Sequence, residues 1–416
     1  MPRIFLDYAS ITPLDPKVEA EMSRVQKKFW ANPSSLHNEG EMAKNILEEA
    51  RINIARFLHC RSNEVFFTSG GTESLNLAIA GVVKNFENGI PHIIVSSIEH
   101  PAVLEPIKNL IKEQKVEISF ISPNEKGLIN PESIKKELKA NTVLIVVQHA
   151  NNEIGTIQPV SKISKIVRNF RELRIKNHEL SKKSSSPELH NSYPIIHNSF
   201  PFLLVDACQS VCFENVSLER LGADILVLDG IKMYGPRGVG VLVVKRDVKI
   251  SPIIFGGGQE RGLRSGTENV AGAVGLTKAL AIASDMREKE TKRLTTLRNY
   301  AVTKILKEIP NSFLNGDLKN RLPNNINICL ASPKPLAKAG LPKIDSEFLV
   351  IKLDTLGFAV SAASACHTLS LENGSYVIES LGREDCGSSS LRITLGRATK
   401  KSDVDKFIST LKKIIK

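Results

Sequence analysis

Between residues 64 and 245 the chain alternates short apolar runs, rich in Val, Ile and Leu, with longer amphipathic segments. Four apolar runs are each followed by a helix-like segment, and these runs occupy residues 64–69, 92–97, 116–122 and 142–148. Further apolar runs extend the series at residues 201–207, 223–229 and 239–245. Apolar runs of this kind are typical of strands buried on both faces, and the segments between them are typical of crossover helices. The pattern predicts a doubly wound α/β domain built on a large, mainly parallel sheet.

The remaining sequence has a different pattern. A helical period runs from about residue 270 to 309, and short strands and helices follow it before an amphipathic helix at the end of the chain. This order predicts a smaller α+β domain. We therefore assign residues 16–262 to the large domain, and residues 1–15 with 263–416 to the small one. Residues 171–200, rich in Ser, Asn, His and Pro, are predicted to form a surface insertion.

Composition and charge limit the class of protein. A chain of 416 residues with 42% hydrophobic and 24% charged residues has the balance of a globular protein with more than one core. The net charge of +12 would suit a nucleic acid or an acidic partner, but much of it lies in residues 161–184 and in the C-terminal tail, where solvated helix faces explain it. With no recognised motif, direct nucleic-acid binding is not expected.

No targeting or metal-binding signal is evident. No apolar run approaches the roughly 20 residues of a membrane-spanning helix, and the N-terminus lacks a signal-peptide pattern, so we expect a cytoplasmic protein. The six cysteines are scattered and include no paired CxxC motif. Their spacing predicts neither a disulfide framework nor a metal site.

Polar residues follow the apolar runs at the point where an open α/β sheet places its ligand. This set comprises Thr68, Ser69, Gly70, Gly71, Thr72, Glu99, His100, His149, Asn151, Asn152, Asp206, Gln209, Asp229 and Lys232. Gly70 and Gly71 stand between a strand and a helix, so backbone N–H groups can converge on a phosphate at the helix N-terminus. No Gly-Lys-Ser/Thr follows them, which disfavours a nucleotide triphosphate.

Lys232 and Asp206 suggest the chemistry of the site. Lys232 lies between two apolar runs, where it could reach the surface, pair with Asp224 or Asp229, or serve as an amine of lowered pKa for imine formation. Asp206 closes a buried strand, where it needs an ion-pair partner, a backbone hydrogen bond or a heterocyclic nitrogen cation. Together with a phosphate cradle and an imidazole at His100, these residues form the set that pyridoxal phosphate requires.

The order of these residues resembles that of the cysteine desulfurases of nitrogen fixation and iron–sulfur assembly, which belong to the class V aminotransferase group of fold type I pyridoxal-phosphate enzymes. The resemblance covers nearly the whole chain. It rests on the segments FLDYASITPLDP, NPSSLHNEG, EVFFTSGGTESLNLAI, EHPAVL, HANNEIGTIQP, VDACQS, GIKMYGPRGVG, GGGQERGLRSGTENV, SAASAC and SSLRITLGRAT.

The resemblance implies roles at the cofactor ring. Lys232 resembles the lysine that forms the Schiff base, and Asp206 resembles the carboxylate that keeps the pyridine nitrogen protonated. His100 is similar to the imidazole that stacks on the ring and takes part in acid–base steps. Gln209 and Asn152 resemble the residues that contact the ring and its oxygen.

The resemblance also implies a phosphate site shared between subunits. Gly71 and Thr72 match the phosphate cradle, and Thr267 matches a residue that reaches the phosphate of the neighbouring subunit, which implies a homodimer. The family usually reads Ser-Gly-His-Lys where this chain has Asp229, Gly230, Ile231 and Lys232. Two phosphate donors are thus absent, and Asp229 would place a negative charge in the phosphate-binding region unless it turned away or paired with Arg237.

The reaction implied by the resemblance converts L-cysteine to L-alanine. Arg392 resembles the arginine that binds the substrate carboxylate, assisted by Asn32. Cys366 occupies the position of the nucleophile, which would receive the sulfur as a persulfide and pass it to an iron–sulfur scaffold or a tRNA-thiolation enzyme. A departure nearby is Ala363, where the family commonly has glycine.

Three alternatives remain open from the sequence. The first is another reaction of the same superfamily, such as that of a selenocysteine lyase or an aminotransferase. The second is a non-catalytic scaffold with weakened cofactor binding, which would explain Asp229 and Ile231. The third is an RNA-binding module, and only the net charge supports it.

Overall fold

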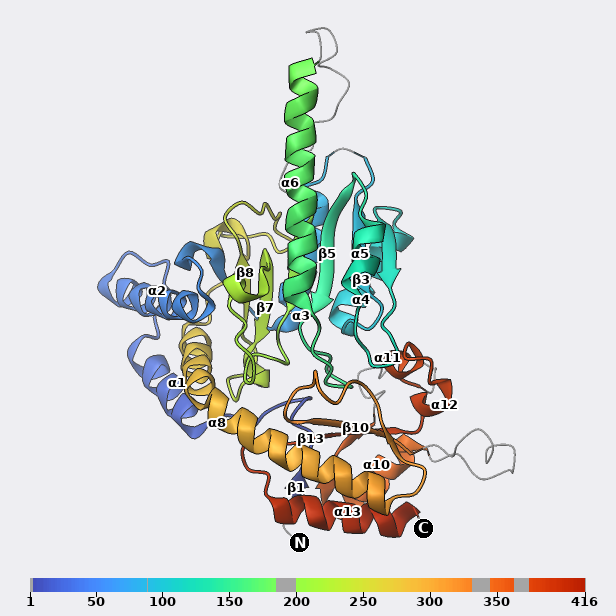
Figure 1. Cartoon of the computed structure of the whole chain (residues 1–416). Coiled ribbons are helices and arrows are strands. Elements are labelled where there is room, and N and C mark those ends of the chain that lie inside the picture. The colour runs from blue at the N-terminus through green and yellow to red at the C-terminus, as the bar shows by residue number, and fades with distance from the viewer. Residues whose placement is uncertain (1–2, 88, 185–199, 331–344, 363–373, 416) are drawn as a thin grey trace.

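A seven-stranded sheet lies at the centre of the larger part of the molecule (Figure 1). The structure is a computed structural model that describes residues 3–87, 89–184, 200–330, 345–362 and 374–415, with only the backbone given for 177–184. The strands are β2 (Val65–Thr68), β3 (His92–Ser96), β4 (Glu117–Ile121), β5 (Thr142–Gln148), β6 (Phe202–Asp206), β7 (Ile225–Asp229) and β8 (Gly240–Val244). Their order is β2-β8-β7-β6-β5-β3-β4, and β8 runs in the opposite direction to the other six strands. The predicted α/β fold with a mainly parallel sheet is confirmed.

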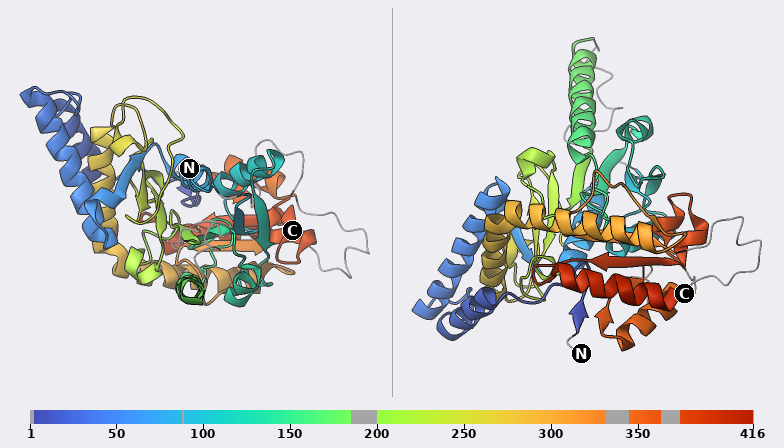
Figure 2. Two further views of the ribbon diagram at one scale, coloured as in Figure 1. Left: turned by 90° about the horizontal axis from the view of Figure 1, so that it is seen from above. Right: turned by 60° about the horizontal axis from the view of Figure 1, so that its bottom comes forward.

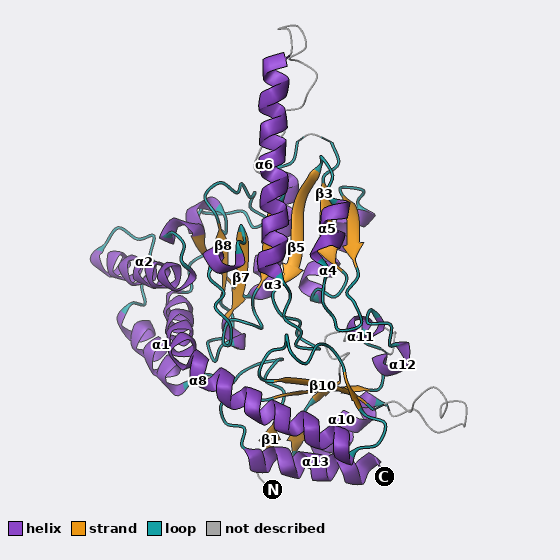
Figure 3. Cartoon of the chain, viewed as in Figure 1, coloured by secondary structure: helices purple, strands orange, loops and turns teal. Residues whose placement is uncertain are grey.

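Helices cover both faces of this sheet (Figure 3). Because side chains alternate along a strand, neighbouring residues of β5 point to different cores: Leu144 and Val146 to one, Ile145 and Val147 to the other. The first core contains α3 (Gly71–Lys84) and α4 (Pro101–Lys112). The second contains residues of α1 (Pro16–Lys28), α2 (Asn38–Leu58), α5 (Pro131–Glu137), α6 (Val160–Ser184), α7 (Leu218–Leu221) and α8 (Val270–Glu308). The crossover connections thus bury the continuous apolar strands from both sides.

A second sheet lies below the first. Its strands are β9 (Phe313–Leu314), β10 (Asn325–Cys329), β12 (Ser361–Ala362) and β13 (Ser390–Thr394), in the antiparallel order β12-β13-β10-β9. Beside it, β1 (Ile4–Phe5) pairs with β11 (Phe358–Ala359). The helices of this part are α10 (Ser346–Thr355), α11 (Tyr376–Glu379), α12 (Glu384–Gly387) and α13 (Lys401–Ile415).

The long helix α8 packs against both parts of the molecule. Its N-terminal half joins the core with α1 and α2, and its C-terminal half lies beside α13 along the second sheet (Figure 1, Figure 2). The helical period predicted for residues 270–309 is confirmed. A boundary between residues 262 and 263 stays a prediction, because α8 contributes to both cores.

The predicted insertion begins as a helix. Helix α6 continues to Ser184 and projects beyond the sheet (Figure 1), so residues 171–184 are helical, whereas residues 185–199 lie outside the described residues. At its base, Arg171 forms an ion pair with Asp224 and donates to the carbonyl of Pro201. Within the described ranges, no helix is both long and apolar enough to cross a membrane.

A disulfide links β10 to α12. Cys329 and Cys386 are bonded, with their Cα atoms 5.4 Å apart, and they are 57 positions apart in sequence. They lie in an apolar cluster with Ile98 and Ile154, which follow β3 and β5 at the carboxyl side of the seven-stranded sheet. The expectation of no disulfide is wrong here, because no motif in the sequence pairs two cysteines so far apart.

The disulfide predicts a redox-dependent stability. Closing a loop of this length stabilises a fold by about 4 kcal/mol in the chain-entropy model. We expect a thiol reductant to lower the thermal denaturation temperature of the protein by several degrees. Cys386→Ala should have a lower denaturation temperature that no longer responds to the reductant, whereas Cys60→Ala should keep the response, since Cys60 is unbonded. An unchanged denaturation temperature in the reduced parent protein would contradict the prediction.

Candidate active site

A cavity of about 290 Å³ lies beyond the carboxyl ends of β5, β6 and β7. Its lining includes the predicted site residues Gly71, Thr72, His100, Asn152, Asp206, Gln209, Asp229, Lys232 and Arg392. Two other predicted residues lie elsewhere: Thr267 is exposed before α8, and the side-chain oxygen of Asn32 accepts the backbone N–H of Ser34. Cys366, with Ala363, is outside the described residues.

Lys232 reaches the cavity from the short connection between β7 and β8. Its Nζ donates hydrogen bonds to the carbonyl oxygens of Ala9 and Ser10, at 2.8 and 2.7 Å. The pairing with Asp224 considered for it is not found, because Asp224 pairs with Arg171 and Lys245. Two carbonyls therefore hold the amine at the wall of the cavity.

Asp206 is the last residue of β6, Gln209 follows it closely, and both line the cavity. Asp206 is buried, and its Oδ1 accepts the backbone N–H of Cys208 at 2.9 Å. Gln209 donates from Nε2 to the carbonyl oxygen of Ala9, also at 2.9 Å. A buried carboxylate therefore faces the same cavity as the lysine amine.

His100 caps the N-terminus of α4. Its Nδ1 accepts the N–H of Ala102 at 3.1 Å, so the neutral ring carries its proton on Nε2. Burial lowers the pKa of His100, and the nearby carboxylate of Asp206 opposes that shift. The imidazole is thus neutral near physiological pH, with Nε2 as the nitrogen that can exchange a proton.

Arg392 enters the cavity from β13 of the second sheet. Its side chain is 1% exposed, and its Nη2 donates to Ser10 Oγ at 2.6 Å and to Asp7 Oδ1 at 3.1 Å. Its Nη1 donates to the carbonyl oxygen of Asn152 at 3.2 Å. In the described part of the chain, the buried atoms Arg392 Nε and Asn152 Oδ1 have no hydrogen-bond partner. Buried polar atoms seldom remain unpaired, so these two indicate the place of a polar ligand.

The phosphate end of the cavity differs from expectation. Asp229 neither turns away nor pairs with the exposed Arg237: its Oδ2 accepts the N–H of Gly71 at 2.9 Å, and its Oδ1 accepts that of Ile231 at 3.2 Å. A Cβ atom at Gly71 would lie 3.2 Å from that Oδ2 and 3.1 Å from Cys208 Sγ. The ring end therefore fits pyridoxal phosphate, while a carboxylate occupies part of the phosphate cradle.

Sequence reasoning missed the contribution of the N-terminal segment. Ala9 and Ser10 supply the carbonyls that hold Lys232, and Asp7 pairs with Arg392. These residues lie in a segment that carried the family resemblance, but backbone carbonyls leave no side-chain signal. Other residues singled out have structural roles instead: His149 bonds Ser210 at 2.9 Å, and burial lowers the pKa of His149 to about 4.

Two buried acids lie behind the cavity. Glu99 accepts the N–H of Gln148 at 3.0 Å, and burial raises its pKa well above the ordinary value. Burial also raises the pKa of Glu153 to about 7, while a hydrogen bond from Ser375 and the charge of Arg392 oppose the shift. Burial therefore favours the neutral, protonated form of both acids.

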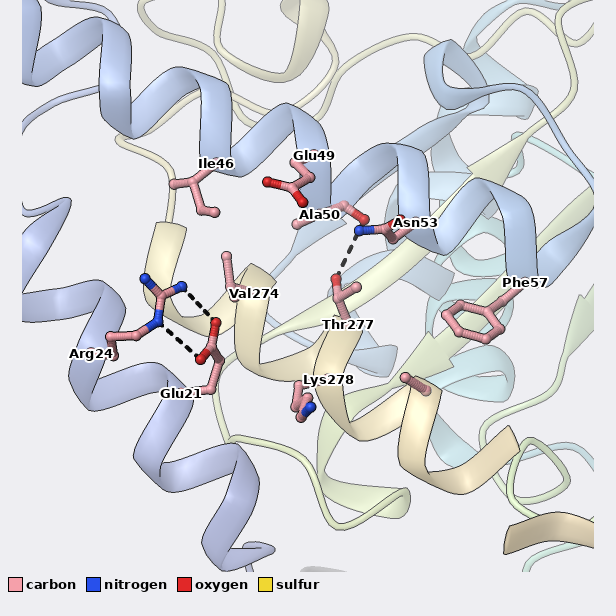
Figure 4. A pocket seen from close by; sticks show the side chains of 11 residues that line it. Glu21, Arg24, Ile46, Glu49, Ala50, Asn53, Phe57, Val274, Thr277 and Lys278 are labelled. Carbon is pink, nitrogen blue, oxygen red and sulfur yellow. Dashed lines mark hydrogen bonds and ion pairs between the residues drawn. The ribbon is translucent and has the colours of Figure 1, made fainter. Parts of the chain in front are cut away.

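A larger pocket of about 480 Å³ lies between α1, α2 and α8 (Figure 4). Arg24 and Glu21 point toward each other there and form an ion pair at 2.7 Å. The hydroxyl of Thr277 donates to backbone carbonyls of Ala50 and Ala273. The described lining of this pocket contains no histidine or cysteine, so it lacks the reactive set of the smaller one. The described residues contain no group of three or more His, Cys, Asp and Glu side chains placed to hold a metal ion.

Known proteins resemble the chain along its whole length. The family model described as aminotransferase class-V matches residues 4–174 and 188–407. The chain belongs to the class-V aminotransferase family. The residues that the family model passes over, 175–187, lie within the predicted insertion.

Relatives within this family agree with the resemblance seen in the sequence. A protein named cysteine desulfurase IscS from Dictyoglomus turgidum is 38% identical over 413 residues, which are 99% of this chain and 94% of the relative. A solved structure described as a NifS-like protein superposes with a TM-score of 0.83 at 29% identity and covers 99% of each chain. A structure of SspA in complex with cysteine has a TM-score of 0.72 at 29% identity, over 94% of this chain and 98% of that one.

The raised pKa of Glu153 predicts a pH-dependent stability. Its folded pKa of about 7 lies above the ordinary value of 4.5, so its stabilising contribution is complete below about pH 4.5 and is lost as the pH rises through 7. The loss amounts to about 3 kcal/mol at 1.36 kcal/mol per pKa unit. Glu153→Gln, which stays neutral, should therefore lose less stability than the parent protein between about pH 5 and pH 8.

Urea unfolding midpoints across this range measure the difference. Glu105→Gln, at an exposed position, is the matched control and should follow the parent curve. If the urea midpoints of the parent and of Glu153→Gln change with pH in parallel, Glu153 does not titrate between about pH 5 and pH 8.

Proposed function

We propose that this protein is a pyridoxal-phosphate-dependent cysteine desulfurase of the cytoplasm, which converts L-cysteine to L-alanine and transfers the sulfur to Cys366. The observation that carries the proposal is the single cavity that unites Lys232, Asp206, His100 and Arg392. Full-length similarity to proteins named cysteine desulfurase supports it, and so does a relative studied in complex with cysteine.

The residues around the cavity suit the cofactor by their chemistry. Lys232 supplies the amine for the aldehyde carbon, and Asp206 supplies the anion for the ring nitrogen. Asn152 and Gln209 would contact the ring substituents, while Gly71 and Thr72 would contact the phosphate. When bound, the cofactor supplies a ring that accepts electrons from the substrate α-carbon.

The substrate would be held by its carboxylate. Arg392 presents a planar fork suited to a carboxylate, and its Nε has no partner in the described part of the chain. We assign Asn32 to assist it. His100 exchanges protons with the substrate through Nε2. This nitrogen is available because Nδ1 already accepts the backbone N–H of Ala102. The protein thereby fixes the orientation of the substrate relative to the cofactor ring.

Cys366 would then accept the sulfur. Its thiolate attacks the sulfur of the bound cysteine, an S–S bond forms and the Cβ–S bond breaks. Protonation of the released carbon gives alanine, so one thiol and one cysteine yield one persulfide and one alanine. An iron–sulfur scaffold or a tRNA-thiolation enzyme would take the sulfur, and Thr267 would complete the phosphate site of a partner subunit in a homodimer.

Absorbance spectroscopy tests the cofactor assignment. We expect the reconstituted protein to be yellow, and Lys232→Ala to lose the visible band because no other described residue of the cavity lining is a lysine. Lys108→Ala, on the surface, should keep the colour. An identical band in Lys232→Ala would overturn the assignment, and a parent protein that stays colourless with added cofactor would favour the scaffold alternative.

Sulfide and alanine release tests the nucleophile. Cys366→Ser should reduce both products from cysteine and reductant by at least about 10³-fold, because a hydroxyl cannot replace the thiolate, while the cofactor colour persists. Cys60→Ser serves as the control and should retain activity. Undiminished alanine release by Cys366→Ser from selenocysteine, with none from cysteine, would instead favour the selenocysteine lyase alternative.

A further inference from the structure

The carboxylate of Asp229 lies where helix α3 begins. The first N–H groups of a helix have no acceptor within the helix, and the helix dipole favours a negative charge there. Asp229 Oδ2 accepts the first of them, from Gly71, at 2.9 Å, although the two residues are 158 positions apart in sequence. The carboxylate thus already supplies an anion to this helix N-terminus.

This contact is tight and lies in the active-site cavity. Gly71, Thr72 and Asp229 all line it. A Cβ atom at Gly71 would approach Asp229 Oδ2 to 3.2 Å, so backbone and carboxylate are closely packed. Asp229 also accepts the N–H of Ile231 at 3.2 Å, which holds the carboxylate toward α3.

Two other residues that line the cavity have unpaired atoms. Arg392 Nε and Asn152 Oδ1 are buried without a partner among the described residues. The ring and substrate end therefore offers polar atoms to a ligand. At the phosphate end, the chain's own anion takes one of the donors.

We propose that Asp229 is an internal anion that competes with the cofactor phosphate for the N-terminus of α3. This inference rests on the proposed function, since it concerns the same cofactor. Because the carboxylate already occupies this position, the phosphate contributes little to the affinity for the cofactor. The cofactor is held mainly through its ring and aldehyde. Asp229 thereby lowers the preference of the site for pyridoxal phosphate over pyridoxal, which lacks the phosphate.

The ratio of two dissociation constants tests this competition. Pyridoxal phosphate and pyridoxal are titrated into the apo forms of the parent, Asp229→Ser and Asp229→Asn, and binding is followed by absorbance and by borohydride trapping at Lys232. Asp229→Ser should bind pyridoxal phosphate at least about tenfold more tightly, equivalent to about 1.4 kcal/mol, and pyridoxal about as the parent does. Asp229→Asn should show a smaller gain, because it removes the charge but can still accept the Gly71 N–H. The exposed Asp247→Ser should leave the ratio unchanged.

A second measurement does not need the cofactor. Inorganic phosphate, compared with chloride at equal ionic strength, should raise the denaturation temperature of Asp229→Ser more than that of the parent protein, because the helix N-terminus is then open to an external anion. Equal ratios in all variants, together with equal phosphate responses, would overturn the inference. If phosphate stabilises Asp229→Ser selectively but no variant is labelled at Lys232, Asp229 still competes with an external anion at the start of α3, and it is the cofactor assignment of the proposed function that fails.

Discussion

The carbonyl oxygens of Ala9 and Ser10 determine how the two sheets share one cavity. They accept the amine of Lys232, which comes from the seven-stranded sheet, while the Ser10 hydroxyl accepts from Arg392 of the four-stranded sheet. Backbone bonds extend the connection, from Thr12 to Ile231 on one side and from Thr394 to Leu6 on the other. This segment contacts both the amine and the guanidinium and thereby helps to fix their spacing.

Much of the fold follows from local pattern. Strands buried on both faces must be continuously apolar, so they were visible in the sequence, and polar residues at their carboxyl ends had to meet at one edge. Asp206 and Lys232 can therefore be predicted as site residues without knowledge of any contact. The placement of Arg392 came from resemblance alone, because nothing in its own strand shows that β13 lies beside the N-terminal segment.

The features that could not be predicted depend on long-range geometry. The Cys329–Cys386 bond joins residues with no local signal, and the roles of Ala9 and Ser10 are played by backbone atoms. From the sequence, Asp229 could lie in the phosphate-binding region, turn away from it or pair with Arg237. Only the close approach of β7 to Gly71 decides among them, and a sequence does not encode that distance in any readable pattern.

The junction between α6 and β6 has an evolutionary consequence. Residues 185–199 connect Ser184 to the segment that enters β6 at Phe202, and this is the amino end of the strand. Asp206 and the chemistry lie at the other end of the same strand, whereas the ion pair between Arg171 and Asp224 braces the middle of α6 near the amino end, where Asp224 accepts the N–H of Leu203. Length and composition can therefore drift at this junction under little selection from catalysis, which makes it a natural position for lineage-specific additions and for attaching a reporter domain.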